Sequence, residues 1–483
     1  MGHFLDIFRQ PIGEVQITYM RNVPNRGMIR YRGFFNQEHI LPTSPEILKE
    51  VLHTRPYTFA KPAKFRIGVG RVRTGLRALP FAEGEEHKQQ RKVLTPAFSY
   101  GQIKALVPTF WERSVQLRDK IEQVIEATGK AGSGGEAVVE VAQWLSLVTL
   151  DIIGVAGFGY ECNALASAPI AGGKAESGSE LAEAYDILFN QGGRAARIRG
   201  LLSAIFPLVA YLPVRRKRQV EKAMAIICRV ADKIIQEKKA EVAKTSDSGE
   251  ELGRDIVTTM LKSGHYSTEA DSPIGDQVLA FLVAGSETTA TAVTWAIYLL
   301  SLPKHRNMQE RLRAEIYSHF PDGLPETVTY EALESLKYMR NVMMEVLRLR
   351  PPLTVTLRQA AHDTTLGGEF VPKGTYIVLA LQAMNRSLEL WGEDADEFNP
   401  NRWEKPVGNN LSFLAFMSGP RGCIGSLFAK VEFKCLLMAL LGSFEFEEAE
   451  EFKGREPAIG GNITQKPVGG IPVCVRKLRW GGG

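Results

Sequence analysis

Residues 413–430 read FLAFMSGPRGCIGSLFAK, a loop rich in Gly and Pro that leads into the apolar, helically spaced segment LFAKVEFKCLLMALL. Cys423 stands where the loop becomes the helix, and Arg421 precedes it by two residues. The pKa of a thiol falls at a helix N-terminus and near cations, which favours a thiolate that can bind a soft metal. Three glycines in the loop would let a flat partner approach closely. The alternative for a lone cysteine is a small buried hydrophobic residue.

The cysteine is part of a longer pattern. The pattern is F-x-x-G-x-R-x-C-x-G, formed by Phe416, Gly419, Arg421, Cys423 and Gly425. It resembles the heme-ligand loop of the cytochrome P450 superfamily, the heme-thiolate monooxygenases. The resemblance implies that Cys423 is the axial ligand of the iron, that Arg421 pairs with a heme propionate and that Phe416 packs beside the thiolate. Met417 departs from the family pattern, which usually has a small or polar residue there.

Composition bounds the fold class and the partners. The chain has 483 residues and 44% hydrophobic content, so it can bury a large core, and length alone favours about three domains. Its five cysteines are scattered, which predicts no disulfide framework and suits a reducing compartment. The net charge of +5 is mild, and the basic cluster at 215–218 is typical of a solvated helix start, so we expect no nucleic-acid partner. We expect neither a secretory signal peptide nor an apolar run long enough to span a membrane.

A second long apolar stretch, residues 274–302, is hydrophobic on every helical face and predicts a buried helix through the centre of the molecule. Its interior carries Gly285, which is unfavourable in a helix, and the polar residues Glu287 and Thr288, which need partners or a role. Taken alone, they could be satisfied within the helix. With the cysteine loop present, the AGSETT sequence resembles the family's oxygen-binding groove. The resemblance implies that Gly285 lies beside the heme and that Glu287 and Thr288 relay protons to the bound oxygen.

Three further residues are candidates for binding the heme propionates. A helix predicted from about residue 85 places His87 and Arg91 four residues apart on one face, where composition alone favours a solvent-facing pair. The family commonly has Trp-x-x-x-Arg at this point. The resemblance therefore implies that both side chains reach a propionate, with His87 as a hydrogen-bond donor in place of Trp. Arg358 stands where the family places another propionate-binding cation.

The pattern Glu345-x-x-Arg348 lies on a predicted helix that ends before Arg-Pro-Pro. E-x-x-R also occurs at 251–254 and 310–313, so only the following prolines and the place upstream of the cysteine loop single this one out. We expect its partner to be Arg402, because a buried glutamate is satisfied by bidentate pairing with arginine. The family uses such a triad to hold the core behind the heme, which is a structural role and not a catalytic one.

Periodicity predicts the remaining elements. Alternation of apolar and polar residues predicts strands at 14–20 and 28–35, and Ser44 followed by Pro and Glu predicts the start of a short helix. Short strands are expected within 353–384, and a C-terminal hairpin is expected with its tip at Ile463 and Thr464. Further helices are predicted at 101–127, 137–159, 180–200 and 217–243.

The resemblance covers essentially the whole chain and overrides the estimate from length. We therefore predict a single domain over 1–483, mainly α with a small β lobe (α+β; approximately 10–60 and 353–384). It would hold heme b between the long central helix and the cysteine loop. The implied activity is a monooxygenase that inserts one oxygen atom of dioxygen into an apolar small-molecule substrate. Substrate walls are expected at 65–82, 201–213, Phe281–Ala284, Leu353–Thr356 and Ile463–Thr464.

No NADPH- or flavin-binding loop is visible in the sequence, so the electrons are expected from another protein. In eukaryotic relatives this is NADPH–cytochrome P450 reductase, and its acidic face would meet the lysines that flank the cysteine side, Lys88, Lys92, Lys430 and Lys434. The loop style resembles filamentous-fungal members that act in secondary metabolism. Microsomal relatives lie on the cytosolic face of the endoplasmic reticulum membrane. No N-terminal anchor is visible here, and the apolar segment 201–213 suits peripheral membrane contact and a core position about equally.

Two other functions are open at this stage. A heme-thiolate isomerase, dehydratase or peroxygenase would need no reductase, and the presence of Glu287 with Thr288 argues against it. A non-catalytic heme-binding or sensor protein would show slow, substrate-independent reduction of its iron and form no product.

Overall fold

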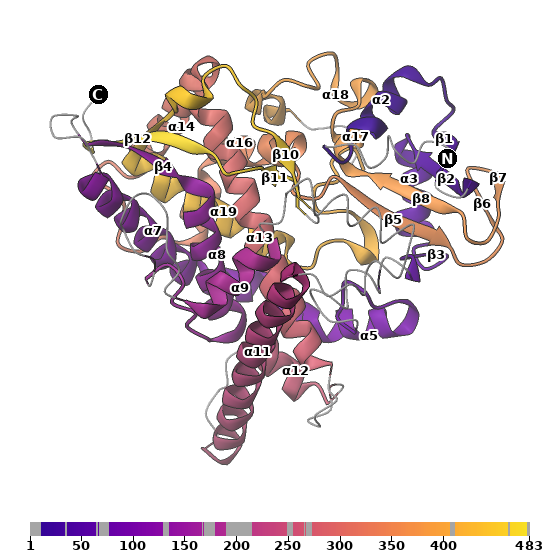
Figure 1. Ribbon diagram of the computed structural model, residues 1–483, viewed down its shortest axis with the longest axis horizontal. Coiled ribbons are helices and arrows are strands. Elements are labelled where there is room, and N and C mark those ends of the chain that lie inside the picture. The colour runs from indigo at the N-terminus through magenta and orange to yellow at the C-terminus, as the bar shows by residue number, and fades with distance from the viewer. Residues whose placement is uncertain are drawn as a thin grey trace.

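The computed structural model describes residues 11–33, 36–63, 66, 77–128, 135–166, 168, 179–189, 215–248, 255–264, 266, 273–405, 411–461 and 464–480. Within them, most of the helices gather on one side and a small β lobe lies on the other, beside the N-terminal end of the chain (Figure 1). The predicted fold class, mainly α with a small β lobe, is therefore confirmed.

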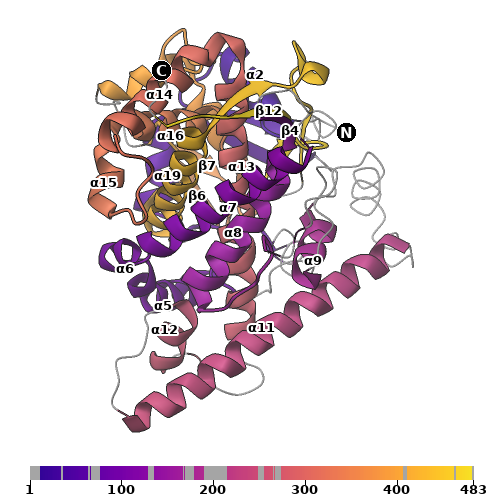
Figure 2. The ribbon, with the colours of Figure 1, turned by 90° about the vertical axis from the view of Figure 1, so that its left-hand side faces the viewer.

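The helical lobe is built around α13 (Ile274–Ser301), which is buried along most of its length, as its apolar faces predict. Among the described residues it packs most extensively on α8 (Val141–Phe158), α11 (Arg215–Ser248), α16 (Lys337–Leu349) and α19 (Ser426–Ser443). The others are α5 (Gly84–Leu94), α6 (Tyr100–Ala105), α7 (Val107–Thr128), α9 (Glu180–Phe189), α12 (Ile256–Lys262), α14 (Arg306–His319) and α15 (Tyr330–Ser335). Figure 2 shows α7 and α8 in front of α13, with α11 running along the lower edge.

The β lobe contains one five-stranded sheet. In spatial order its strands are β1 (Met28–Arg32), β2 (Glu38–Pro42), β8 (Tyr376–Ala380), β5 (Val355–Ala360) and β3 (Phe59–Ala60). All neighbours are antiparallel except β2 and β8, which run parallel with His39 opposite Tyr376. A separate hairpin joins β6 (Thr364–Leu366) and β7 (Glu369–Val371). The strands expected at 28–35 and within 353–384 are thus confirmed.

Short helices accompany this sheet. Ser44 caps α3 (Pro45–Lys49), as predicted, because its hydroxyl accepts the N–H of Ile47. The strand predicted at 14–20 is wrong: this segment is α2 (Glu14–Asn22), which packs on α17 (Leu381–Asn385). Its buried Ile17 and the ion pair of Arg21 with Asp396, at 2.8 Å, depend on distant segments, and these contacts override the local alternation. The remaining short elements are α18 (Leu388–Trp391), the π-helix Glu50–Thr54 and the 3₁₀-helices Thr95–Phe98, Pro303–His305, Pro400–Glu404, Gly419–Arg421 and Glu450–Phe452.

The prediction of a single helix at 137–159 is wrong, because this segment forms a strand followed by a helix. β4 (Glu136–Glu140) pairs with β12 (Pro472–Lys477), which also pairs with β9 (Phe444–Glu448). The carboxylate of Glu140 then caps α8 by accepting two backbone N–H groups. Local periodicity could not show this, since the partner strand comes from the far end of the chain. The predicted C-terminal hairpin is confirmed as β10 (Ile459–Gly460) and β11 (Lys466–Pro467).

Two helices among the described residues, α8 and α13, are long and apolar enough to cross a membrane, which the sequence did not predict. In each, 78% of the apolar window is buried inside the fold, as in the core helices of a globular protein. The predicted helix at 180–200 is observed over α9. Segment 201–213 and Ile463 lie outside the described residues.

Candidate active site

The cysteine loop connects the packing of the two lobes. Phe416 packs against the main hydrophobic core of the helical lobe, whereas Met417, with a left-handed φ of 58°, packs against the core of the β lobe. Gly419 also has a positive φ, 76°, and a Cβ there would come within 2.1 Å of the carbonyl oxygen of Leu52. Only glycine allows this approach. The departure from the family pattern at Met417 therefore falls on a packing contact.

Backbone hydrogen bonds fix the position of Cys423. Its N–H donates to the carbonyl oxygen of Phe416 at 2.9 Å, and the N–H of Gly422 donates to the carbonyl oxygen of Gly419 at 2.9 Å. The N–H of Gly425 donates to the Cys423 thiol just before α19 begins. The loop is therefore closed on itself, and the sulfur stands at its end.

Cys423 faces an interior space. Its side chain is exposed, yet burial among protein atoms raises the pKa of its thiol. The N–H of Gly425 and the charges of Arg91 and Lys430 oppose this rise in pKa without overcoming it. The low pKa predicted from Arg421 is thus wrong for the protein alone, because burial outweighs the nearby cations. A thiolate at this position needs a stronger positive partner, and a coordinated metal ion deprotonates a thiol outright.

Several buried cations lie together near the loop. Arg421, whose side chain is 2% exposed, donates to the carbonyl oxygen of Ala82 at 3.3 Å and pairs with Glu83. Burial and the charge of Arg421 lower the pKa of Arg358 to about 10. Burial, Arg358 and Arg421 lower the pKa of Lys61 well below its usual value. These side chains repel one another, and the carboxylate of Glu83 offsets only part of their charge.

His87 and Arg91 belong to the same cluster and are not a solvent-facing pair. His87 is 3% exposed, and its Nδ1 is 3.0 Å from the hydroxyl of Tyr57. Burial, then Arg421, Lys61 and Arg91, lowers the pKa of His87 to about 4, so the ring is neutral at pH 7. Arg91 donates to the carbonyl oxygen of Gly422 at 2.6 Å, directly beside Cys423.

The cluster fits an anionic group. Two nitrogens of Arg421, Nε and Nη1, are buried and have no hydrogen-bond partner among the residues that the structure describes. A buried guanidinium is stable only when it is paired, and carboxylates bind it best. Propionate carboxylates would supply that charge, and an iron would supply the cation that the thiol of Cys423 needs. The residues present therefore fit a heme.

Two members of this cluster, Lys61 and Tyr57, were not predicted. Tyr57 lies under the guanidinium of Arg421, 5.7 Å from ring centroid to carbon, and under the ammonium of Lys88. Both residues stand near the short strand β3, without any motif around them. Only the fold brings them to the cysteine loop, so the sequence held no signal for them.

The central helix presents an open face close to the predicted groove. Ala284 is exposed, although the residues before it in α13 are buried. The hydroxyl of Thr288 donates to the carbonyl oxygen of Ala284 at 2.8 Å. Phe281 on α13 stacks with Phe98 at 5.4 Å between centroids, and Phe98 also lies against the backbone at Gly425 of the cysteine loop. Helix α13 and the cysteine loop thus share Phe98 as a neighbour.

Gly285 itself has a packing reason for being glycine. A Cβ at this position would stand 2.6 Å from Cγ1 of Ile153 on α8, which is closer than carbon atoms approach. A side chain at 285 would therefore point toward α8, whereas the accessible residue in this turn is Ala284. Contact of Gly285 with a cofactor stays a prediction.

The carboxylate of Glu287 is bound by the C-terminal hairpin. Thr464 donates to its Oε1 at 2.7 Å, and Nζ of Lys466 is 3.3 Å from the same oxygen. Thr464 was predicted to line the substrate pocket, but its hydroxyl is taken up by Glu287. Lys466 was not predicted, because a lysine in a hairpin carries no motif.

A second buried acid, Glu432 on α19, was also not predicted. It is fully buried, and no hydrogen bond of normal geometry reaches either carboxylate oxygen from the described residues. Burial raises its pKa well above the usual value, while the hydroxyl of Thr289 on α13 acts to lower that pKa. Burial therefore favours the neutral, protonated form of this carboxyl.

The predicted triad is confirmed. Arg348 donates to both oxygens of Glu345 at 2.8 Å, and both side chains are 0% exposed. Arg402 donates to Oε1 of Glu345 at 2.9 Å, and Trp403 donates to Oε2 at 2.9 Å. Arg348 also binds carbonyl oxygens of the segment 385–397. The triad ties α16 to the segment that precedes the cysteine loop.

The lysines expected to meet an electron donor are not equivalent. Lys88 and Lys92 on α5 are exposed, and Lys88 pairs with its neighbour Glu85. Lys434 is 2% exposed and pairs with Glu334, so it is not available to a partner. Lys430 lies over the ring of Phe416 at 5.0 Å. The surface for an acidic partner is therefore narrower than predicted.

Parts of the predicted substrate walls are described. Ala78 and Phe81 pack with Ala280 of α13, and Leu79 donates its N–H to Gln277 on the same helix at 3.1 Å. Leu353 is exposed. Segment 201–213 and most of 65–76 lie outside the described residues.

Known proteins resemble this chain over nearly its whole length. The sequence profile of the family described as Cytochrome P450 matches residues 16–470. Cytochrome P450 monooxygenase FUM15 of Gibberella moniliformis is 36% identical, over 98% of this chain and 86% of that protein. Cytochrome P450 monooxygenase sphH of Aspergillus fumigatus is 36% identical, over 93% and 81%, and cytochrome P450 monooxygenase ptmK of Penicillium ochrochloron is 32% identical, over 99% and 91%. The chain therefore belongs to the cytochrome P450 family and is a heme-thiolate monooxygenase, an oxidoreductase that incorporates oxygen from dioxygen into a substrate with electrons from a redox partner.

Proposed function

We propose that residues 1–483 form a single monooxygenase domain that holds heme b between α13 and the cysteine loop. One observation supports this most: the accessible but desolvated thiol of Cys423 lies beside a buried cluster of cations with unpaired guanidinium nitrogens. A thiol that needs a cation and guanidinium groups that need anions together suit an iron porphyrin with two propionates.

Each residue around the cofactor has its own part. Cys423 would bind the iron through its sulfur, and Phe416, whose carbonyl oxygen accepts the Cys423 N–H, would pack beside it. The free nitrogens of Arg421 bind a propionate, and the other side chains of the cluster are placed to bind or neutralise the propionates, namely Arg91, Arg358 and neutral His87. Gly285 permits the close packing of α8 on α13 that sets the wall of the groove. When bound, the heme supplies the activation of dioxygen.

Proton delivery is the task of α13. Glu287 is the acid, with Oε2 buried and without a hydrogen-bond donor among the described residues. Thr288 donates to the carbonyl oxygen of Ala284, so the lone pairs of its hydroxyl can accept a hydrogen bond from the acid side. Both residues are only partly exposed, which limits the access of bulk water to the pair. The pair therefore argues for a reductase-driven monooxygenase over an isomerase or a passive heme carrier.

The substrate is an apolar small molecule, and the reaction inserts one oxygen atom into it. The side chains that support this are the exposed Ala284 and Leu353 and the apolar contact of Phe81 with α13. The likeness to fungal monooxygenases supports a role in secondary-metabolite biosynthesis. Electrons come from NADPH through NADPH–cytochrome P450 reductase, which would meet the exposed Lys88 and Lys92. The protein acts at the cytosolic face of the endoplasmic reticulum membrane, in peripheral contact with it.

Two experiments on the purified protein test this proposal. A pyridine hemochromogen spectrum identifies the heme type, and a product labelled from ¹⁸O₂ in the presence of NADPH and reductase identifies the reaction. We expect heme b and one labelled oxygen atom in a product from a panel of apolar compounds. Product formation without NADPH or reductase would favour the isomerase, dehydratase or peroxygenase alternative. Heme reduction with no product from any compound would favour a non-catalytic heme protein.

A further inference from the structure

The acid of the central helix is held by the C-terminal hairpin. Thr464 and Lys466, both on this hairpin, contact the same oxygen of Glu287, at 2.7 and 3.3 Å. Thr464 is 1% exposed, and the side chains of Glu287 and Lys466 are 11% and 22% exposed. In such a buried setting, a hydrogen bond and an ion pair to one oxygen restrict the carboxylate strongly.

The second oxygen of this carboxylate is in a different state. Oε2 of Glu287 is buried, and none of the described residues donates a hydrogen bond to it. The next residue, Thr288, turns its hydroxyl proton toward Ala284 and so does not donate to Glu287 either. A buried carboxylate oxygen without a donor is unfavourable, unless it accepts a hydrogen bond from a water molecule or is protonated. Oε1 is thus taken up by protein contacts, whereas Oε2 is left available to a proton donor.

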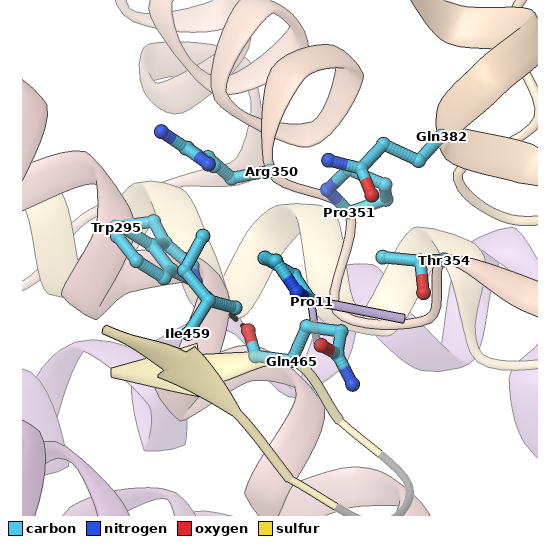
Figure 3. Close-up of a pocket in the computed structure, with 8 residues that line it drawn as sticks. All are labelled: Pro11, Trp295, Arg350, Pro351, Thr354, Gln382, Ile459 and Gln465. Carbon is cyan, nitrogen blue, oxygen red and sulfur yellow. Dashed lines mark hydrogen bonds between the residues drawn. The ribbon is translucent and has the colours of Figure 1, made fainter. Parts of the chain in front are cut away.

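The position of the hairpin does not depend on Glu287. The carbonyl oxygen of Gln465 accepts the indole N–H of Trp295 at 3.0 Å, and the N–H of Gln465 donates to the carbonyl oxygen of Pro352 at 2.8 Å. Figure 3 shows Gln465 and Trp295 together in the wall of a cavity of about 10 Å³, which has room for about one water molecule. These backbone contacts should survive when the side chains that hold Glu287 are changed.

The charges around Glu287 come from three elements. Lys466 on the hairpin is the cation that pairs with it in the described part of the chain. Burial raises the pKa of Glu140 at the start of α8, and the charge of Lys466 opposes that rise, so Lys466 lies between two carboxylates. Burial, then Cys162 and Glu287, raises the pKa of Tyr185 on α9, which keeps this phenol neutral. Lys466 is therefore the positive charge that pairs with Glu287, Nζ to Oε1, among the described residues.

We propose that Lys466 and Thr464 are positioning residues for proton delivery, an inference that rests on the proposed relay through Glu287 and Thr288. They hold the carboxylate by Oε1, which fixes its rotamer and leaves Oε2 to exchange protons in the turn of Thr288. No electron moves in this step. One proton enters from solvent at Oε2 and passes to the hydroxyl oxygen of Thr288. That hydroxyl releases its own proton to the dioxygen that is being reduced, so Glu287 and Thr288 both return to their starting charge.

The test measures how dioxygen is consumed when the reductase supplies electrons from NADPH and no organic substrate is present. Dioxygen that takes two electrons and two protons leaves as hydrogen peroxide, whereas dioxygen that takes four of each leaves as water. A damaged relay therefore raises the amount of peroxide per NADPH oxidised. Lys466→Met and Thr464→Val are expected to slow water formation by about tenfold, less than the roughly 100-fold expected when a positioned acid is lost.

Matched variants separate positioning from other effects. Lys466→Arg and Thr464→Ser keep the charge and the hydroxyl, so they should restore the wild-type amount of peroxide per NADPH. Glu287→Gln and Thr288→Ala test the relay itself, and an unchanged peroxide yield in both would show that the proposed relay is wrong. If these two raise the yield while Lys466→Met and Thr464→Val do not, the relay stands and the positioning inference is overturned.

A second readout does not use turnover. Amide hydrogen exchange of the peptide that covers residues 464–467 should be the same in Lys466→Met and in the wild type, since Trp295 and Pro352 hold this backbone. Faster exchange in the variant would show that Lys466 holds the hairpin and does not merely orient the acid. That result would contradict the inference, whatever the peroxide yield.

Discussion

Replacing Gly285 with alanine tests whether this glycine serves helix packing or the cofactor. A Cβ at position 285 would stand 2.6 Å from Cγ1 and 2.7 Å from Cδ1 of Ile153. Carbon atoms in contact are normally about 3.5–4.0 Å apart, so α8 and α13 would have to separate by about 1 Å or Ile153 would have to leave its rotamer. Overpacking of this kind costs about 1–3 kcal/mol.

An opposite effect must be included. Alanine is favoured over glycine by about 1 kcal/mol in a helix interior, so Gly285→Ala should destabilise the wild type by roughly 0–2 kcal/mol. Ile153→Ala removes both clashing atoms and itself costs about 2–5 kcal/mol. In that background only the Cβ of residue 153 stays close, at 3.2 Å, so most of the clash is removed and Gly285→Ala should stabilise by up to about 1 kcal/mol. The two substitutions are therefore coupled by about 1–3 kcal/mol.

Denaturant unfolding of the wild type, the two single variants and the double variant measures this coupling, and heme content is measured in parallel. A change of sign between the two backgrounds supports the packing role. If Gly285→Ala has the same effect on the free energy of unfolding in both, the clash is absent and the reasoning is refuted. If stability is unchanged and heme content falls, the glycine serves the cofactor, as the family resemblance implies.

Three other predictions use the same unfolding measurement. Because burial lowers the pKa of His87 to about 4 from 6.5, the unfolded chain binds a proton first as the pH falls. The cofactor-free protein should then lose up to about 3 kcal/mol of stability between pH 6.5 and 4, and His87→Gln should lose clearly less; equal losses would show that His87 is not the cause. Glu345→Gln should cost about 3–5 kcal/mol, because it leaves Arg348 buried without a counter-charge. Glu432→Gln should cost less than about 1.5 kcal/mol, because burial favours the neutral form of that carboxyl and glutamine is neutral too. Similar costs for the two variants would contradict this contrast. The Met417→Val variant should be less stable than Met417→Asn by about 1 kcal/mol, because a β-branched residue resists a φ of 58°. This order is expected although valine is the more apolar residue. The reverse order would mean that burial of the side chain, and not the backbone conformation, determines the stability of these variants.

Motifs with a strong local spacing could be predicted from the sequence. The helix of residues 274–302 is apolar on every face, and the structure confirms it as the central helix. The E-x-x-R pattern with the following prolines correctly predicted the triad of Glu345, Arg348 and Arg402, because the charge of a buried acid dictates its partners. The cysteine loop was recognisable since its glycines and its arginine stand at fixed spacing.

Contacts between distant segments could not be predicted. Strand β4 lacks a local signal because its partner β12 lies near the other end of the chain. Lys61 joins the cation cluster, and Lys466 binds Glu287, only after the fold brings separate loops together. The pKa of the Cys423 thiol was predicted wrongly because burial cannot be read from neighbouring residues.

The claim that Cys423 binds heme iron as a thiolate is tested most directly by the absorption spectrum of the reduced protein with carbon monoxide. We predict the strongly red-shifted Soret band of a thiolate-ligated carbonyl complex in the wild type, and its loss in Cys423→His, which offers imidazole in place of sulfur. Properly folded wild-type protein without heme would contradict the claim. So would a Soret band at the position typical of imidazole or neutral thiol ligation.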